Sequence, residues 1–254
     1  MMQSRGFSLI EMAFVLVIIT LLLGGLLVPF TTQVEQRRIA ETNKAMEEIK
    51  EALVGYALSH SSTATPSQPY LPCPDAITGA SGANVTNDGL EDRNAGGTCD
   101  QAEGNLPWAT LGLGNQDAWG HRFHYRVSAT FSNQTTGFAL TPPGGDIRIC
   151  AKSTAGGNPC QTIATGVPAV VISFGKNGYG GLSVDGIRNL PAVASDDEKE
   201  NFGNILIPAF GISLDFASRV PTPAGTPATE FDDLVIWLSP NVLYNRMVAA
   251  GKLP

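Results

Sequence analysis

The sequence predicts an α+β protein, in which a long N-terminal helix, half of it transmembrane, packs on a mainly antiparallel β-sheet head with irregular disulfide-braced loops. Three observations predict this fold. An apolar segment fills residues 7–30, an amphipathic helical pattern continues over 31–60, and short strand-like runs separated by glycine and proline occupy the head, 61–254. A short leader, residues 1–6, precedes the apolar segment.

The apolar segment 7–30 is long enough to cross a bilayer, which takes about 20 helical residues. It is longer than the apolar core of a secretory signal peptide, about 7–15 residues, and no A-x-A-like cleavage site closes it. We therefore expect a retained single span, with Arg5 on the cytoplasmic side and the head on the other. Glu11 lies inside this segment, where a carboxylate is costly unless it is paired, and the next basic residues are only at 37 and 38.

After Pro29 the apolar residues return at helical spacing. The separations are seven, three, four and three residues, along the stripe Ile39, Met46, Ile49, Leu53 and Tyr56. One helix over 8–59 is therefore expected, roughly 75–80 Å long at 1.5 Å per residue. Gly24, Gly25 and Pro29 weaken it and predict a kink there.

The head shows four strand-like runs and one closing helix. The runs at 122–127 and 146–150 alternate polar and apolar residues, 169–174 is continuously apolar as in a strand buried on both faces, and 234–238 is a short late strand. An apolar side and a terminal glycine predict a helix over 239–253.

Four cysteines lie in the head, and none forms a C-x-x-C pair, which argues against zinc or thioredoxin-like chemistry. An even number in a segment that leaves the cytoplasm favours two disulfides. Three pairings are possible, and we favour Cys73–Cys99 with Cys150–Cys160 because each closes a local loop rich in glycine and asparagine. The alternative is four buried free thiols.

Charge and motifs argue against two classes of function. The net charge of −7 opposes the phosphate contacts of a nucleic-acid-binding protein, although Arg122 and Arg126 share one strand face. The sequence holds no G-x-S-x-G, H-E-x-x-H or phosphate-loop motif, and His121 and His124 are expected at the surface. We therefore do not expect an enzyme.

The segment from Arg5 to Glu11, RGFSLIE, resembles the prepilin peptidase site of type IV pilins and type II secretion pseudopilins. This resemblance implies cleavage after Gly6, N-methylation of Phe7, and a filament in which Glu11 meets the Phe7 amine of a neighbouring subunit. The implied partners are a prepilin peptidase, other pilin or pseudopilin subunits and an inner-membrane assembly platform. The implied location is the inner membrane, with a periplasmic head, and then a periplasmic or extracellular filament. In related filaments the weakened stretch around Pro29 often loses helicity on assembly, which is the alternative to a kink.

Three head segments resemble the major pseudopilin of type II secretion. Residues 117–125, 173–181 and 231–237 are similar to its D-P-W-G-x-x-Y-x-Y, S-x-G-x-D-G-x-x-G-G and A-D-I-x-x-W segments. The order matches but the spacing does not, because this chain carries large insertions. A minor or specialised subunit is therefore expected, with a pilus-tip adhesin or initiator and a DNA-uptake pilin as alternatives.

The same resemblance implies a possible calcium site, because that pseudopilin binds calcium in its late loop. Here residues 195–201 offer hard oxygen ligands, of which Asp196, Asp197 and Glu200 are the candidates. Asn177 stands where the family has Asp, and no EF-hand pattern is present. A solvated acidic loop is the alternative, and no other cofactor is expected.

Processing makes a direct prediction for the start of the mature chain. Mass spectrometry of the protein from its native membrane should find N-methyl-Phe7 as the first residue, because the peptidase cuts after Gly6 and methylates the new amine. A chain that still begins at Met1 would contradict the pilin interpretation.

Overall fold

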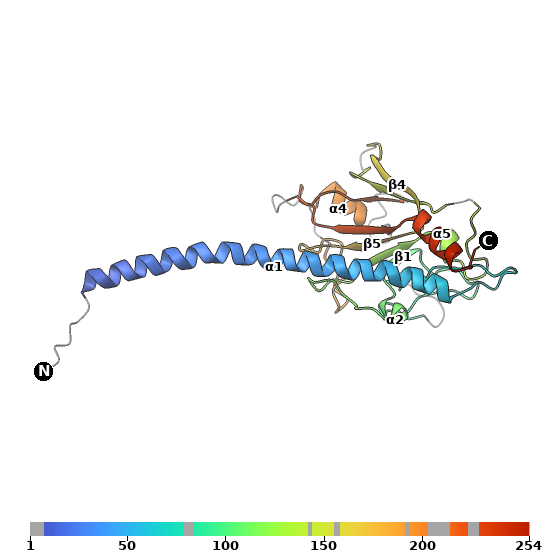
Figure 1. Cartoon of the computed structure of the whole chain (residues 1–254), viewed down its shortest axis with the longest axis horizontal. Coiled ribbons are helices and arrows are strands. Elements are labelled where there is room, and N and C mark those ends of the chain that lie inside the picture. The colour runs from blue at the N-terminus through green and yellow to red at the C-terminus, as the bar shows by residue number, and fades with distance from the viewer. Residues whose placement is uncertain are drawn as a thin grey trace. The chain divides into compact units, whose positions relative to one another are not determined.

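The computed structural model describes residues 8–78, 84–141, 144–154, 158–190, 194–202, 214–222 and 229–253, without the side chains of 23–30. The chain divides into two units, Met1–Glu41 and Thr42–Pro254, and each is described by itself. Figure 1 shows the course of the chain, and the second unit holds all the strands.

The helix α1 (Leu9–Ser59) begins in the first unit and ends in the second, as the apolar periodicity predicted. It remains helical through Gly24, Gly25 and Pro29, so loss of helicity there is not a property of the isolated chain. Within the described residues, no helix combines the length and the hydropathy that a membrane crossing needs. Parts of the expected span over 7–30, namely Phe7 and the side chains of 23–30, lie outside the described residues.

Two sheets, rather than the one expected, form the second unit. The first is antiparallel throughout and has the order β1 (Glu103–Asn105), β2 (His124–Val127), β5 (Ala169–Ser173), β7 (Leu234–Leu238). The second has the order β4 (Thr162–Val167), β3 (Ile147–Cys150), β6 (Asp215–Ala217), and its β3–β6 pair is parallel. The four predicted strands are confirmed as β2, β3, β5 and β7. The strands β1, β4 and β6 were not predicted, because two have only three residues and β4 carries a glycine in a largely exposed run.

The short helices are α2 (Trp108–Leu111), α3 (Ala129–Ser132) and α4 (Asp196–Asn201), and α5 (Pro240–Ala249) closes the chain. The predicted helix over 239–253 is confirmed as α5. It follows Ser239 and has proline in its first turn, where proline needs no hydrogen-bond partner for its nitrogen. The acidic segment at 195–201, expected as a loop, contains the helix α4, whose first turn Ser195 caps by accepting from the Glu198 N–H.

The strand β5 is at the centre of the second unit because it is buried on both faces. Its residues Ala169 and Val171 pack with α1 and α5, whereas Val170 and Ile172 pack with the second sheet. Since side chains alternate along a strand, one continuous apolar run can serve both layers. The four-stranded sheet is therefore the middle layer, with α1 and α5 on one face and the three-stranded sheet on the other.

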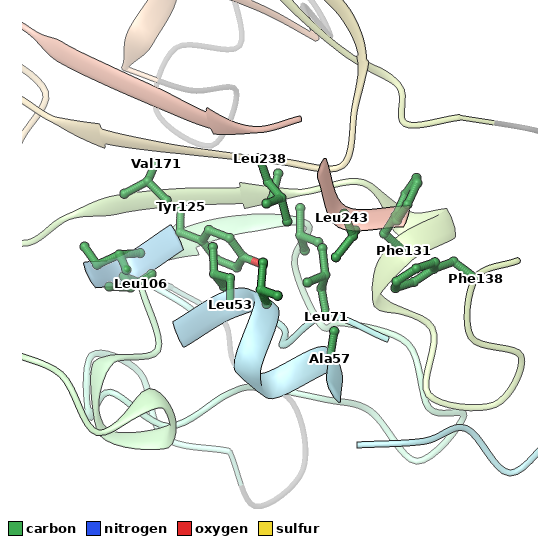
Figure 2. Packing of buried hydrophobic residues seen from close by; sticks show 14 of the residues in the cluster. Leu53, Ala57, Leu71, Leu106, Tyr125, Phe131, Phe138, Val171, Leu238 and Leu243 are labelled. Carbon is green, nitrogen blue, oxygen red and sulfur yellow. The ribbon is translucent and has the colours of Figure 1, made fainter. Parts of the chain in front are cut away.

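The predicted stripe on α1 provides one side of the larger core. Met46, Ile49 and Leu53 are each at most 2% exposed. Figure 2 shows Leu53 of α1 close to Tyr125 of β2, with Leu238 and Leu243 beside them. Burying each such side chain stabilises the fold by roughly 1.5–3 kcal/mol.

Both favoured disulfides are confirmed. Cys73 joins Cys99 and thereby braces the irregular segment that follows α1. Cys150 joins Cys160, so that the end of β3 is tied to the residues just before β4. No free cysteine remains.

A buried ionic group joins β1 to β2. Glu103 contacts His124 Nε2 at 2.9 Å through one oxygen and accepts from Arg126 Nη1 at 2.7 Å through the other. His124 is 3% exposed, so its expected surface position is wrong. Arg122 is buried as well, with its guanidinium 3.9 Å from the centre of the Trp108 ring. The strand face that Arg122 and Arg126 share is therefore interior.

The charge of Glu103 depends on its partners. Burial alone would raise the pKa of Glu103, but hydrogen bonds and charges from His124 and Arg126 outweigh it and lower this pKa to about 2. A carboxyl whose pKa is depressed by folding stabilises the native state above its ordinary pKa of 4.5. That contribution is lost as the pH falls from this value toward 2.

We therefore expect Glu103→Gln to reduce the free energy of unfolding at pH 7 by about 3–5 kcal/mol, the usual effect of removing one partner from a buried ion pair. The difference from wild type should shrink between pH 4.5 and pH 2, because wild-type Glu103 becomes protonated over that range. Urea denaturation at several pH values measures both effects. Glu47→Gln, an exposed change on α1, is the control, and a pH-independent difference would contradict the assignment.

Candidate functional site

The processing site lies at the beginning of the chain. Gly6 and Phe7 lie outside the described residues, which begin at Ser8. Glu11 lies in the first turn of α1, and its carboxylate accepts a hydrogen bond from the Ser8 N–H at 3.0 Å. In sequence, Glu11 lies four residues after Phe7, whose amine cleavage after Gly6 would create.

The first unit exposes a long apolar surface around Glu11. Leu9, Ile10 and Phe14 are each more than 60% exposed, and the described side chains from Val15 to Leu22 are exposed as well. Exposed apolar patches of this kind mark contact with a membrane or with another protein. Cationic groups are absent from residues 8–22, so within this described stretch no side chain neutralises Glu11.

The three acidic residues predicted for calcium all lie on or at the start of α4, but the structure directs them to separate partners. Asp197 accepts from Arg219 Nε at 2.5 Å and from the Ser153 N–H at 2.7 Å. Glu200 accepts from the hydroxyls of Ser153 and Thr154, and Asp196 is exposed beside Lys199. These residues are therefore not gathered into one group of ligands.

A different acidic residue of α4 belongs to a carboxylate cluster. Glu198, Asp232 and Asp233 each offer one oxygen, and these oxygens lie within 4.8 Å of one another. Glu198 is 0% exposed and Asp233 is 2% exposed. Among the described residues, only these three form a group of acidic, histidine or cysteine side chains that could hold a metal ion.

Two asparagines supply the hydrogen bonds that hold the cluster. Asn177 donates its side-chain amide to Glu198 Oε1 at 2.8 Å and its backbone N–H to Asp232 Oδ2 at 2.9 Å. Asn201 donates to Asp233 Oδ2 at 2.8 Å. The second oxygens of Glu198 and Asp233 are buried and accept no hydrogen bond.

A glycine lets the two chain segments approach at this point. Gly175 has a φ of +57°, a conformation that side chains rarely adopt. A Cβ at this position would lie 2.3 Å from the carbonyl oxygen of Asp232. Glycine is therefore needed where the loop after β5 passes the segment before β7.

The carboxylates of the cluster are difficult to ionise together. Burial, followed by the charge of Asp232, raises the pKa of Glu198 to about 7, against the help of the Asn177 hydrogen bond. Burial and then the charge of Glu198 raise the pKa of Asp233 well above its ordinary value. Like charges at this spacing need either protons or a cation between them.

The donor set fits a hard divalent cation. Calcium binds carboxylate, amide and carbonyl oxygens, and two buried oxygens of the cluster accept no hydrogen bond from the protein. Asn177 Oδ1 accepts from the Tyr179 N–H. Its side-chain amide and its backbone N–H donate to two members of the cluster, Glu198 and Asp232 respectively. Calcium bound there would neutralise the carboxylates and add bonds between distant segments.

Only part of this carboxylate cluster could be predicted from the sequence. Asp232 and Asp233 are adjacent, precede a predicted strand and lie in a segment that resembles the major pseudopilin. Glu198 was one of several acidic residues in 195–201, and nothing local distinguishes it from its neighbours. Glu198, rather than one of these neighbours, belongs to the cluster because of the orientation of α4.

A serine, an aspartate and a histidine also lie together, but not in a catalytic order. Ser173 donates its hydroxyl to Asp117 at 2.6 Å, and the ring nitrogen Nδ1 of His121 lies 3.8 Å from Asp117 Oδ2. Nucleophilic catalysis requires the base to accept the proton of the serine. Here Asp117 receives it and Ser173 is fully buried, so the group supports the turn before β2.

Residues 1–27 match the prokaryotic N-terminal methylation motif, the signature of type IV pilins and pseudopilins. No curated protein and no solved structure matches the chain. The motif supports a type IV pilin-like or pseudopilin precursor. It implies processing by a prepilin peptidase and assembly with other pilin subunits.

Proposed function

We propose that the protein is a structural subunit, of a minor or specialised kind, of a type IV pilus or a type II secretion pseudopilus. The observation that carries this proposal is the methylation motif with Gly6, Phe7 and Glu11 at its spacing. The subunit would enter the inner membrane, lose residues 1–6 and then move into a filament through α1.

The chemistry of the first helical turn supports this route. Cleavage after Gly6 creates a cationic amine on Phe7, and Glu11 of a neighbouring subunit is a suitable counterion in an apolar filament core. A shift of one subunit along the filament would separate the two charges. The pair would therefore set the register between neighbouring subunits in the filament. The exposed apolar side chains from Leu9 onward supply the surface that such a core would bury.

An extracytoplasmic position for the head agrees with its two disulfides, because such bonds persist in oxidising compartments. The membrane span over 7–30 and the single-pass orientation are part of this proposal. The size of the head and the large insertions between the segments that resemble the major pseudopilin support a specialised role rather than that of the repeating shaft subunit.

Calcium is the cofactor that we propose, held by Glu198, Asp232 and Asp233 rather than by Asp196, Asp197 and Glu200. Hard oxygen donors, deep burial and oxygens that accept no hydrogen bond support this choice. The ion would supply positive charge and structural cross-linking, not catalysis.

Replacement of Glu11 tests the filament proposal. Glu11→Ala should be cleaved and methylated normally but should assemble poorly, because removing one partner from a buried ion pair costs about 3–5 kcal/mol per contact. Mass spectrometry of the N-terminus and quantification of sheared filaments measure the two steps. Glu48→Ala, in the second unit, is the control, and normal assembly of Glu11→Ala would refute the pairing.

Calorimetry with the full chain in detergent tests the cofactor proposal. Calcium should bind at one site, and Asp233→Asn should weaken binding at least about tenfold, because it removes a charged ligand from a buried site. Asp196→Asn, an equivalent change at an exposed carboxylate of α4, should bind like wild type. Equal affinities for Asp233→Asn and wild type would place the ion elsewhere.

A further inference from the structure

The strand β7 forms one edge of the four-stranded sheet. It pairs with β5 along all five of its residues, from Leu234 to Leu238, and with no other strand in the part of the chain that the structure describes. In an edge strand every second residue turns its N–H and C=O away from the neighbouring strand. The outer side of β7 therefore presents a row of backbone donors and acceptors that the sheet itself does not pair.

Two other sheet edges of the head are closed by the chain itself. Beyond β1, the backbone of Asp75 exchanges hydrogen bonds with that of Asn105 in both directions, at 2.9 and 3.0 Å. Beyond β6, the side chain of Asn201 accepts from the Ala217 N–H at 2.8 Å and donates to the Ala217 carbonyl oxygen at 3.0 Å. Both devices occupy positions at which a further strand would bind.

The two remaining edge strands, β4 and β7, differ in chemistry. The strand β4 is largely exposed and carries two threonines and a glycine. The strand β7 has the sequence LVIWL, which holds no charge, no proline and no glycine. An apolar edge without such protection is a template for pairing with another chain. Of the two, β7 is therefore the edge whose exposure to water is unfavourable.

A hollow of about 250 Å³ follows the edge of β7. It is lined by Val235, Ile236 and Trp237 and by Lys50 of α1. Successive side chains of a strand point to opposite faces, so a hollow that touches three in a row lies along the edge and not over one face. Val235 and Trp237 pack partly with the second sheet, whereas Ile236 packs partly with the core beneath α1. A strand added here would therefore extend both apolar layers.

The lining of the hollow indicates the chemistry of its ligand. Among the described residues that line it, only Lys50 is charged, and its ammonium already donates to Glu47 Oε2 at 2.8 Å. The hollow is therefore a poor site for a charged small molecule. Apolar walls beside backbone groups at the spacing of a strand match an extended polypeptide instead. In such complexes the main chain supplies affinity, and the side chains set the preference for a sequence.

We propose that the outer edge of β7 binds an extended apolar segment of a partner protein, which adds to the four-stranded sheet as a further strand. Strand addition pairs the outward backbone groups of β7 and buries the exposed parts of Val235, Ile236 and Trp237 in a single step. These residues all lie in the second unit. The filament contact through the first half of α1 is therefore a separate proposal with its own test.

Fluorescence anisotropy with the full chain in detergent tests the strand addition. The probe is a labelled synthetic peptide with the sequence of residues 168–174, PAVVISF, because it contains β5, the strand that already pairs with β7. The unmethylated peptide should bind, since the main chain supplies most of the contact.

Two doubly N-methylated forms of this peptide distinguish strand pairing from apolar adsorption. Methyl groups at the positions of Val170 and Ile172 block one edge of the peptide, so it can still pair through the other and should bind within about threefold of the unmethylated form. Methyl groups at the adjacent positions of Val170 and Val171 block both edges and should weaken binding at least about tenfold.

A variant of β7 tests the location. Val235→Lys places a charge in the hollow and should weaken binding of the unmethylated peptide at least about tenfold, since lysine on an edge strand opposes strand addition. Ile163→Lys, the same kind of change on β4, where Ile163 is 47% exposed, is the control and should bind like wild type. Thermal melting followed by circular dichroism checks that both variants fold. The methylated peptides decide the question on wild-type protein if Val235→Lys does not.

Three results would overturn the proposal. The first is absence of binding by the unmethylated peptide. The second is equal binding of the two methylated forms, which would indicate apolar adsorption. The third comes from sedimentation of the chain without peptide, because dimers that Val235→Lys separates would assign the edge to a second copy of this chain.

Discussion

The burial of the apolar stripe on the second half of α1 is the contact on which the rest of the head depends. Met46, Ile49 and Leu53 cover one face of the four-stranded sheet, where they meet Tyr125 and Val171. Because that face is covered, the opposite face of β5 can serve a second sheet, and the apolar run at 169–173 is buried on both sides. Without α1, the four-stranded sheet would expose an apolar face to water.

Polar groups buried between layers then define where the head is rigid and where it can respond. Glu103 between His124 and Arg126 is compensated, so its charge stabilises the β1–β2 pair. In the cluster of Glu198, Asp232 and Asp233 three carboxylates meet, and the buried Glu198 Oε2 and Asp233 Oδ1 accept no hydrogen bond. The arginine that contacts Glu103 directly makes that group a structural support, whereas the carboxylate cluster is a candidate ion site.

Prediction from the sequence succeeded where the signal was local. The helical spacing from Ile39 to Tyr56 predicted the second half of α1, the apolar run predicted β5, and loop composition predicted both disulfide pairings. It failed for β1 and β6, which are three residues long and exist through pairing with β2 and β3. It placed His124 at the surface, because alternation along a strand identifies two faces but does not tell whether the polar face is covered.

The sequence by itself determined the match to the N-terminal methylation motif, because that motif is short and linear and includes Gly6, Phe7 and Glu11. It also determined the long helix, since periodicity is a property of neighbouring residues. Only the tertiary structure decided which carboxylates meet. Glu198 and Asp233 are far apart in the chain, and the orientation of α4 against β6 and β7 turns Glu198 inward while Asp196 remains in solvent.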